Sequence, residues 1–174
     1  AAGRCTQPNR LFGDRQLTIQ ELYEAIGAFN AGRMTHEEFQ DVEDHACPGA
    51  GACGGQFTAN TMATACEMLG LAPMGLNSIP ALDTGKSAAA RECGRLVMQL
   101  LHAGVCPRQL VNHRSMQNAI AGVMATGGST NAVLHLLAIA LEFEIDLSID
   151  EFDRISRQTP VLANMRPWGT YTAL

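Results

Sequence analysis

The chain has 174 residues, of which 47% are hydrophobic and 17% are charged, so it is long and apolar enough to bury a core. Its formal net charge of −5 and pI near 5.5 argue against a nucleic-acid-binding surface. No apolar run approaches the roughly 18 residues that a membrane-spanning helix needs. These properties indicate a globular protein.

The first five residues contain neither a starting methionine nor the apolar segment of a signal peptide. We therefore expect a chain that is processed or cut from a longer protein, and not a secreted one. The six cysteines include no C-x-x-C pair, and two of them fall within predicted helices. This pattern favours free thiols in a reducing compartment. The cysteines are Cys5, Cys47, Cys53, Cys66, Cys93 and Cys106.

Three capping-box patterns mark helix starts, at Thr18, Thr35 and Ser148, each followed by a glutamate three residues later. Apolar residues recur at helical spacing after each start and in four further segments. The predicted helices cover residues 19–29, 35–44, 57–70, 87–102, 115–124, 132–141 and 148–157.

Little in the chain predicts a β-strand. Residues 105–111 and 161–163 are the two candidates for short strands, and Pro107 weakens the first. Residues 132–141 are apolar on all sides, which predicts burial in a larger core. With about seven helices and very little strand, the predicted fold class is mainly α.

A glycine-rich loop at residues 47–55 is the most informative stretch. It contains Cys47, Cys53 and four glycines, which allow a tight backbone and close approach to a ligand. A following helix N-terminus favours a thiolate over a thiol, so Cys53 is a candidate metal ligand or nucleophile. A tight turn with two small buried thiols explains the same pattern. The residues alone leave both interpretations open.

A second glycine pair, Gly127-Gly128, precedes Ser129, Thr130 and Asn131 and the predicted helix at 132–141. A helix end without bulky side chains offers N–H donors to carboxylates, phosphates or cluster sulfurs. A sharp helix–helix turn with Ser129 as the N-cap is the alternative. Neither glycine loop matches the G-x-x-x-x-G-K-[ST] pattern, so nucleotide binding has little support.

The five histidines show no H-E-x-x-H spacing. A metal site of His45, Cys47 and Cys53 is one candidate, because these residues are close in sequence. His135 lies within an apolar helix and is expected to be a core histidine. The chain has no G-x-S-x-G nucleophile elbow.

Two long motifs resemble signatures of the dihydroxy-acid dehydratase family, which also includes 6-phosphogluconate and sugar-acid dehydratases. They are ACPGAGACGGQFTANTMA at residues 46–63 and ATGGSTNAVLHLLA at residues 125–138. DEFDRISR at 150–157 and Thr159-Pro160 also fit, and the resemblance runs from about Leu17 to the last residue. It implies that residues 1–174 form a single partial domain, the latter part of the family's larger α/β N-terminal domain.

The resemblance implies that Cys53 is one of three thiolate ligands of an iron–sulfur cluster, 2Fe–2S rather than 4Fe–4S. It leaves Cys47 as a structural thiol. Three thiolates on a two-iron cluster leave one iron site open for a substrate hydroxyl. Ser129, Thr130 and Asn131 are expected to line the cluster or carboxylate pocket.

In the family, the other two cluster cysteines and the Asp and carbamylated-Lys ligands of Mg²⁺ lie upstream of this segment. The proton-abstracting serine and a Glu ligand of Mg²⁺ lie in a C-terminal barrel domain. This chain contains no S-C-D-K motif, and the residues next to Cys5 do not match any part of that motif. We therefore expect no catalytic residue in this segment, and we expect the segment alone to be inactive and to expose an apolar face.

The predicted function is a segment of a dihydroxy-acid dehydratase, a hydro-lyase that converts 2,3-dihydroxy acids to 2-oxo acids in branched-chain amino-acid synthesis. The alternatives are a sugar-acid or 6-phosphogluconate dehydratase, or a non-catalytic helical domain with a structural zinc or thiol site. The expected partner is a small dihydroxy acid, without nucleic acid or membrane, and the complete enzyme is expected to be a homodimer. The expected compartment is the bacterial cytoplasm or an organelle matrix.

Overall fold

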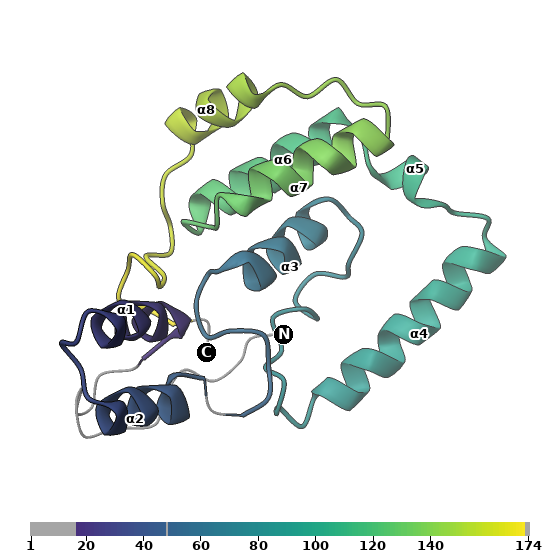
Figure 1. The fold of residues 1–174 in the computed structure, drawn as a ribbon. Helices are drawn as coiled ribbons and strands as arrows, with labels where there is room; N and C mark the ends of the chain where they lie inside the picture. Colours follow the sequence, from purple (N-terminus) through teal and green to yellow (C-terminus); the bar gives the residue numbers. More distant parts are fainter. Residues whose placement is uncertain (1–16, 48, 173–174) are drawn as a thin grey trace.

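The computed structural model describes residues 17–47 and 49–172 (Figure 1). Within these residues the chain forms eight helices, and a β-bridge joins Met165 to Tyr171. The mainly α prediction is therefore confirmed. The helices are α1 (Ile19–Asn30), α2 (His36–Ala46), α3 (Thr58–Met68), α4 (Lys86–His102), α5 (Pro107–Leu110), α6 (His113–Ala125), α7 (Asn131–Glu142) and α8 (Ile149–Gln158).

Two separate apolar cores hold the helices together. α1 and α2 pack on each other around Leu17, Ala25, Val42 and Ala46. The larger core lies among α3, α6, α7 and α8, and Figure 1 shows α3 alongside α6 and α7. Its buried residues are Ala65, Leu69, Val111, Met116, Ala119, Ile120, Val123, Ala132, Leu136, Ala140, Phe152 and Ile155.

The capping boxes predicted at Thr18 and Thr35 are both formed. The Thr18 hydroxyl accepts from the backbone N–H of Gln20, and the Thr18 N–H donates to Glu21 Oε2 at 2.7 Å. The Thr35 hydroxyl likewise accepts from the Glu38 N–H at 3.2 Å. These contacts satisfy donors that a helix start otherwise leaves free, which is why the starts of α1 and α2 are readable from the sequence.

The box predicted at Ser148 is not formed, although α8 is present. Ser148 makes no side-chain capping bond. The carboxylate of Glu151 instead accepts from Gln117 Nε2 at 3.0 Å and contacts His113 Nε2 at 3.1 Å. The glutamate that the motif assigns to capping therefore ties α8 to α6.

Both predicted strands are wrong. Pro107 begins the short helix α5, where its missing N–H costs nothing, and the Cys106 N–H donates to Gln109 Oε1 at 2.9 Å. Residues 161–163 are not a strand, because the N–H groups of Leu162 and Ala163 both donate to the Ala125 carbonyl at the end of α6. Backbone donors in this segment thus bind a helix end.

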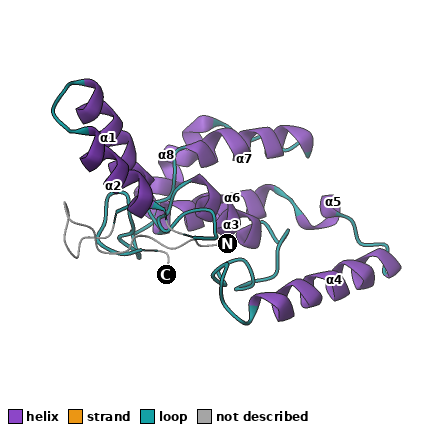
Figure 2. Cartoon of the chain, turned by 60° about the horizontal axis from the view of Figure 1, so that its bottom comes forward, coloured by secondary structure: helices purple, strands orange, loops and turns teal. Residues whose placement is uncertain are grey.

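Apolar side chains remain exposed on α4 and α7. α4 buries only Ala89 and extends away from the larger core, as Figure 2 shows. Leu134 and Leu141 on α7 are 69% and 80% exposed, so the described residues bury one face of this helix rather than all of it. His135 is also exposed, so the prediction that it is a core histidine is wrong.

Among the described helices, none combines the length and apolarity that crossing a membrane requires.

The turn between α6 and α7 lies directly against α3. Gly128 in this turn approaches Thr61, which is fully buried in α3. A Cβ at Gly128 would lie 2.8 Å from Thr61 Cγ2 and 3.0 Å from Val123 Cγ1. Both neighbours are β-branched and cannot easily rotate away.

We expect Gly128→Ala to lower the free energy of unfolding by about 1–3 kcal/mol, because the added methyl overpacks this contact. Urea unfolding followed by circular dichroism measures the change. Gly94→Ala on α4 is the control, since no atom lies within 4 Å of the added Cβ there. Equal stability of the two variants would contradict the close packing of the turn on α3.

A buried ion pair joins α1 to the segment that follows α8. Glu21 is 4% exposed, accepts from the Thr18 hydroxyl at 2.6 Å, and lies 3.1 Å from Arg166 Nη1. Burial by itself raises the pKa of Glu21, but the hydrogen bonds from Thr18 and the charge of Arg166 outweigh it, so the pKa lies below its ordinary value of 4.5. The folded carboxyl therefore binds a proton less tightly than the unfolded one.

This stabilisation is fully present above pH 4.5 and is lost as the pH falls through the lowered pKa. We expect Glu21→Gln to lower the free energy of unfolding at neutral pH by about 1–3 kcal/mol. We also expect the variant to lose stability less steeply in acid. Denaturation across a pH series measures both effects, with Glu24→Gln on the exposed side of α1 as the control. An acid profile identical to that of the parent chain would show that Glu21 is not the titrating group.

Candidate functional site

The glycine-rich loop before α3 holds Cys53 as a free, half-buried thiol. Gly49 and Gly51 have φ values of +93° and +127°, a backbone conformation that side-chain-bearing residues rarely adopt. The Cys53 thiol donates to the Gly55 carbonyl at 3.4 Å. The predicted position of Cys53, in the turn just before a helix, is confirmed.

The donor facing the Cys53 sulfur is a side-chain amide from the first turn of α3. Asn60 is 8% exposed, and its Nδ2 lies 3.4 Å from Cys53 Sγ. The same nitrogen lies 3.0 Å from the Cys53 carbonyl and 2.7 Å from the Gly55 carbonyl. One buried amide therefore holds both ends of the turn that presents the thiol.

Gln56 connects this loop to the C-terminal part of the chain. Its N–H donates to the Arg166 carbonyl at 2.7 Å, and its side-chain amide donates to the Thr126 hydroxyl at 3.0 Å. Its carbonyl accepts from the Thr61 hydroxyl at 3.1 Å. Gln56 is 3% exposed, so these three partners supply the hydrogen bonds that water would otherwise make to its polar groups.

The second glycine loop meets the start of α3 through Ser129 and Asn131. The Ser129 N–H donates to the Thr61 hydroxyl at 3.0 Å, and Asn131 Nδ2 donates to the Thr58 hydroxyl at 2.8 Å. The Ser129 hydroxyl lies 3.3 Å from Thr58 Oγ1 and accepts from the Asn131 N–H. The N-cap of α7 is Thr130, one residue after the predicted Ser129.

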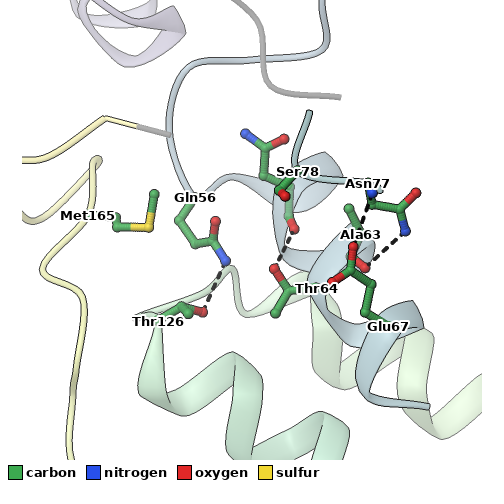
Figure 3. Close-up of a pocket in the computed structure, with 9 residues that line it drawn as sticks. Gln56, Ala63, Thr64, Glu67, Asn77, Ser78, Thr126 and Met165 are labelled. Atoms are coloured by element: carbon green, nitrogen blue, oxygen red, sulfur yellow. Dashed lines mark hydrogen bonds between the residues drawn. The ribbon is translucent and has the colours of Figure 1, made fainter. Parts of the chain in front are cut away.

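Two small cavities flank Gln56. The first, of about 170 Å³, is shown in Figure 3, where the Gln56 amide points to Thr126. Its lining residues are Gln56, Asn60, Ala63, Thr64, Glu67, Asn77, Ser78, Thr126 and Met165. The second, of about 210 Å³, is lined by Gln56, Phe57, Gly127, Gly128, Ser129, Thr130, Pro167 and Trp168.

The structure thus separates the predicted site residues into two neighbouring places. Ser129 and Thr130 line the second cavity, while Asn131 is hydrogen-bonded to Thr58. Cys53 lines neither cavity, and Asn60 lies between its sulfur and the first one.

The candidate metal site of His45, Cys47 and Cys53 is not found. The described residues contain no group of three His, Cys, Asp or Glu side chains that could hold a metal ion. His45 Nδ1 lies 2.7 Å from the Asp41 carbonyl and 3.3 Å from Asp41 Oδ1, within its own helix. Cys47 is exposed, but partial desolvation of its thiol and the proximity of Cys53 raise the pKa of Cys47, which favours its neutral form. Cys5 lies outside the described residues.

Sequence patterns missed the polar residues that support the site. Gln56, Asn60 and Thr61 are buried although they lie in a polar stretch of the motif at residues 46–63. Asn60 and Thr61 follow Gln56 by four and five residues, and this spacing is a signal that could have been used. Polar residues on the buried face of a helix start require partners, and these three find them in the loop and the turn.

Comparison with known proteins identifies relatives of this chain. A family model described as dihydroxy-acid/6-phosphogluconate dehydratase N-terminal matches residues 1–174. The dihydroxy-acid dehydratase of Koribacter versatilis is 51% identical over 162 residues, which cover 93% of this chain and 28% of the relative. That of Thermus thermophilus is 54% identical over 159 residues, covering 91% and 29%.

An archaeal relative has similar identity. The dihydroxy-acid dehydratase of Sulfurisphaera tokodaii is 48% identical over 169 residues, which cover 97% of this chain and 30% of the relative. The chain therefore spans only 28% to 30% of the length of these three curated relatives. The family match over its whole length and these identities show that the chain belongs to the dihydroxy-acid/6-phosphogluconate dehydratase family.

Proposed function

We propose that this chain is part of a dihydroxy-acid dehydratase, a hydro-lyase that converts 2,3-dihydroxy acids to 2-oxo acids in branched-chain amino-acid biosynthesis. The observation that carries the proposal is the identity of 48% to 54% with proteins of that name over at least 91% of the chain. The glycine loop, the second glycine turn and α8 all lie within residues 1–174, which the family model matches.

We propose that Cys53 is one thiolate ligand of an iron–sulfur cluster, of the 2Fe–2S type. The chemistry of its surroundings fits this role, because the thiol is free, half-buried and faces an N–H donor. The described residues supply no set of three ligands, and we propose that the remaining ligands lie outside them. When bound, such a cluster supplies an open iron site that acts as a Lewis acid toward the departing hydroxyl.

The residues of this chain hold and shape that site. Asn60 and Gln56 fix the backbone of the Cys53 turn, and Thr61 fixes the second glycine turn against it. Ser129 and Thr130 line a cavity beside Gln56. We propose that this cavity belongs to the pocket that accepts the substrate carboxylate, for which hydroxyl and backbone donors are suited.

The remaining features of the complete enzyme follow from the family resemblance. We propose Mg²⁺ as a second metal, with its ligands outside this segment, and a homodimer as the assembly. The bacterial and archaeal relatives support a cytoplasmic location in such organisms, and an organelle matrix is the corresponding place in eukaryotes.

Substrate turnover by the complete protein tests the proposed activity. We expect dehydration of a branched-chain 2,3-dihydroxy acid to the 2-oxo acid, detected as its hydrazone, with much slower turnover of 6-phosphogluconate and of sugar acids. The family description names both enzyme types, whereas the relatives compared above carry the dihydroxy-acid name. Faster turnover of a sugar acid would assign the chain to the other branch.

The Cys53 ligand role is tested by Cys53→Ser in the complete protein. We expect loss of the visible cluster absorption, of bound iron and sulfide, and of activity to background, because serine cannot replace the thiolate. Cys93→Ser on α4 is the matched control, since that thiol is exposed and lies outside the loop. Cys47→Ser tests the structural role of the neighbouring thiol, and we expect it to retain the cluster. A Cys53→Ser protein with an unchanged spectrum would refute the assignment.

A further inference from the structure

The side-chain amide of Asn60 faces three acceptors with only two hydrogens. Its distances are 2.7 Å to the Gly55 carbonyl, 3.0 Å to the Cys53 carbonyl and 3.4 Å to Cys53 Sγ. The shortest contact takes one N–H. The second N–H lies between the oxygen and the sulfur of the same cysteine, a shared geometry in which the stronger acceptor decides where the hydrogen points.

Deprotonation of Cys53 changes this balance. In the thiol state the Cys53 S–H donates to the Gly55 carbonyl at 3.4 Å. A metal-bound thiolate has no proton to donate, so this contact is lost, and the sulfur becomes a charged acceptor. Among the described residues, the Asn60 amide is the donor hydrogen-bonded to that sulfur.

Asn60 is also held firmly enough to keep this orientation. It is 8% exposed, and its own carbonyl accepts from the Thr64 hydroxyl at 3.1 Å one turn later in α3. Its backbone belongs to the first turn of the helix, so the amide is carried by a regular element and reaches back to the preceding loop. Such a buried, fixed dipole acts on a nearby charge with little screening by water.

We propose that Asn60 is a positioning residue for the cluster, which donates an N–H···S hydrogen bond to the Cys53 thiolate and thereby raises the reduction potential of the cluster. The proposal depends on the proposed role of Cys53 as a ligand. Hydrogen bonds to cluster sulfurs stabilise the reduced state, because that state carries one more negative charge. The bond to the sulfur draws electron density from the thiolate, and the contacts of the same amide with the Cys53 and Gly55 carbonyls hold the turn from 53 to 55.

The test uses the complete protein in its cluster-loaded form, with Asn60→Ala and Asn60→Asp. Alanine removes the donor, and aspartate keeps the shape while placing an acceptor where the N–H was. We expect both variants to show a more negative potential in a redox titration followed by electron paramagnetic resonance. The expected change is about tenfold in the equilibrium constant for reduction, or about 59 mV for one electron. Asn77→Ala is the matched control, because it removes an asparagine amide that donates to the Ala63 carbonyl of α3 and not to the Cys53 turn.

A merely structural role would reduce the cluster content of the variants without moving the potential of the clusters that remain. Wild-type potential in loaded Asn60→Ala and Asn60→Asp would therefore overturn the proposal while leaving Cys53 as a ligand. A retained cluster in Cys53→Ser would instead overturn the proposed role of Cys53 as a cluster ligand.

A measurement on the wild-type protein decides the matter if both variants lose the cluster. Pulsed electron paramagnetic resonance of the reduced protein, prepared with ¹⁵N in the asparagine side-chain amides, detects a nitrogen hydrogen-bonded to a cluster sulfur. We expect a weak ¹⁵N coupling of this kind. Its absence would overturn the proposal.

Discussion

The hydroxyl of Thr61 is the contact on which the site depends. It donates to the Gln56 carbonyl in the first glycine loop and accepts from the Ser129 N–H in the second. Thr61 is completely buried, so neither partner can be replaced by water without opening the structure. An unsatisfied buried polar group costs about 1–3 kcal/mol. One side chain thus fixes two loops that are far apart in the sequence.

This contact changes how the two glycine pairs are understood. Gly128 must be a glycine because a Cβ would meet Thr61, and a Cβ at Gly55 would lie 2.7 Å from Phe57 Cε2 and 3.0 Å from the Arg166 carbonyl. Both positions therefore need glycine for close packing of protein on protein. The sequence suggested glycines that admit a ligand, yet the described contacts alone are sufficient to require them.

Local signals made the fold largely predictable, whereas the site was only partly so. The starts of α1 and α2 depend on the neighbours of Thr18 and Thr35, and a capping box lies within four residues. The missing box at Ser148 depends on Glu151 meeting Gln117 in another helix, which local spacing does not contain. The role of Asn60 was likewise hidden, because it arises only when the loop folds back onto α3.

Arg166 connects the site to α1 and α2, which share no apolar core with it. Its side chain pairs with the buried Glu21 of α1, and its carbonyl accepts from the Gln56 N–H. The α1–α2 pair has its own small core, and Arg166 provides a polar link between this pair and the loop. The Glu21 carboxylate is stabilised as the anion, so its ion pair with Arg166 is present at neutral pH and is lost when the carboxyl is protonated. The loop that carries Cys53 and the buried charge on α1 therefore share Arg166 as a common partner.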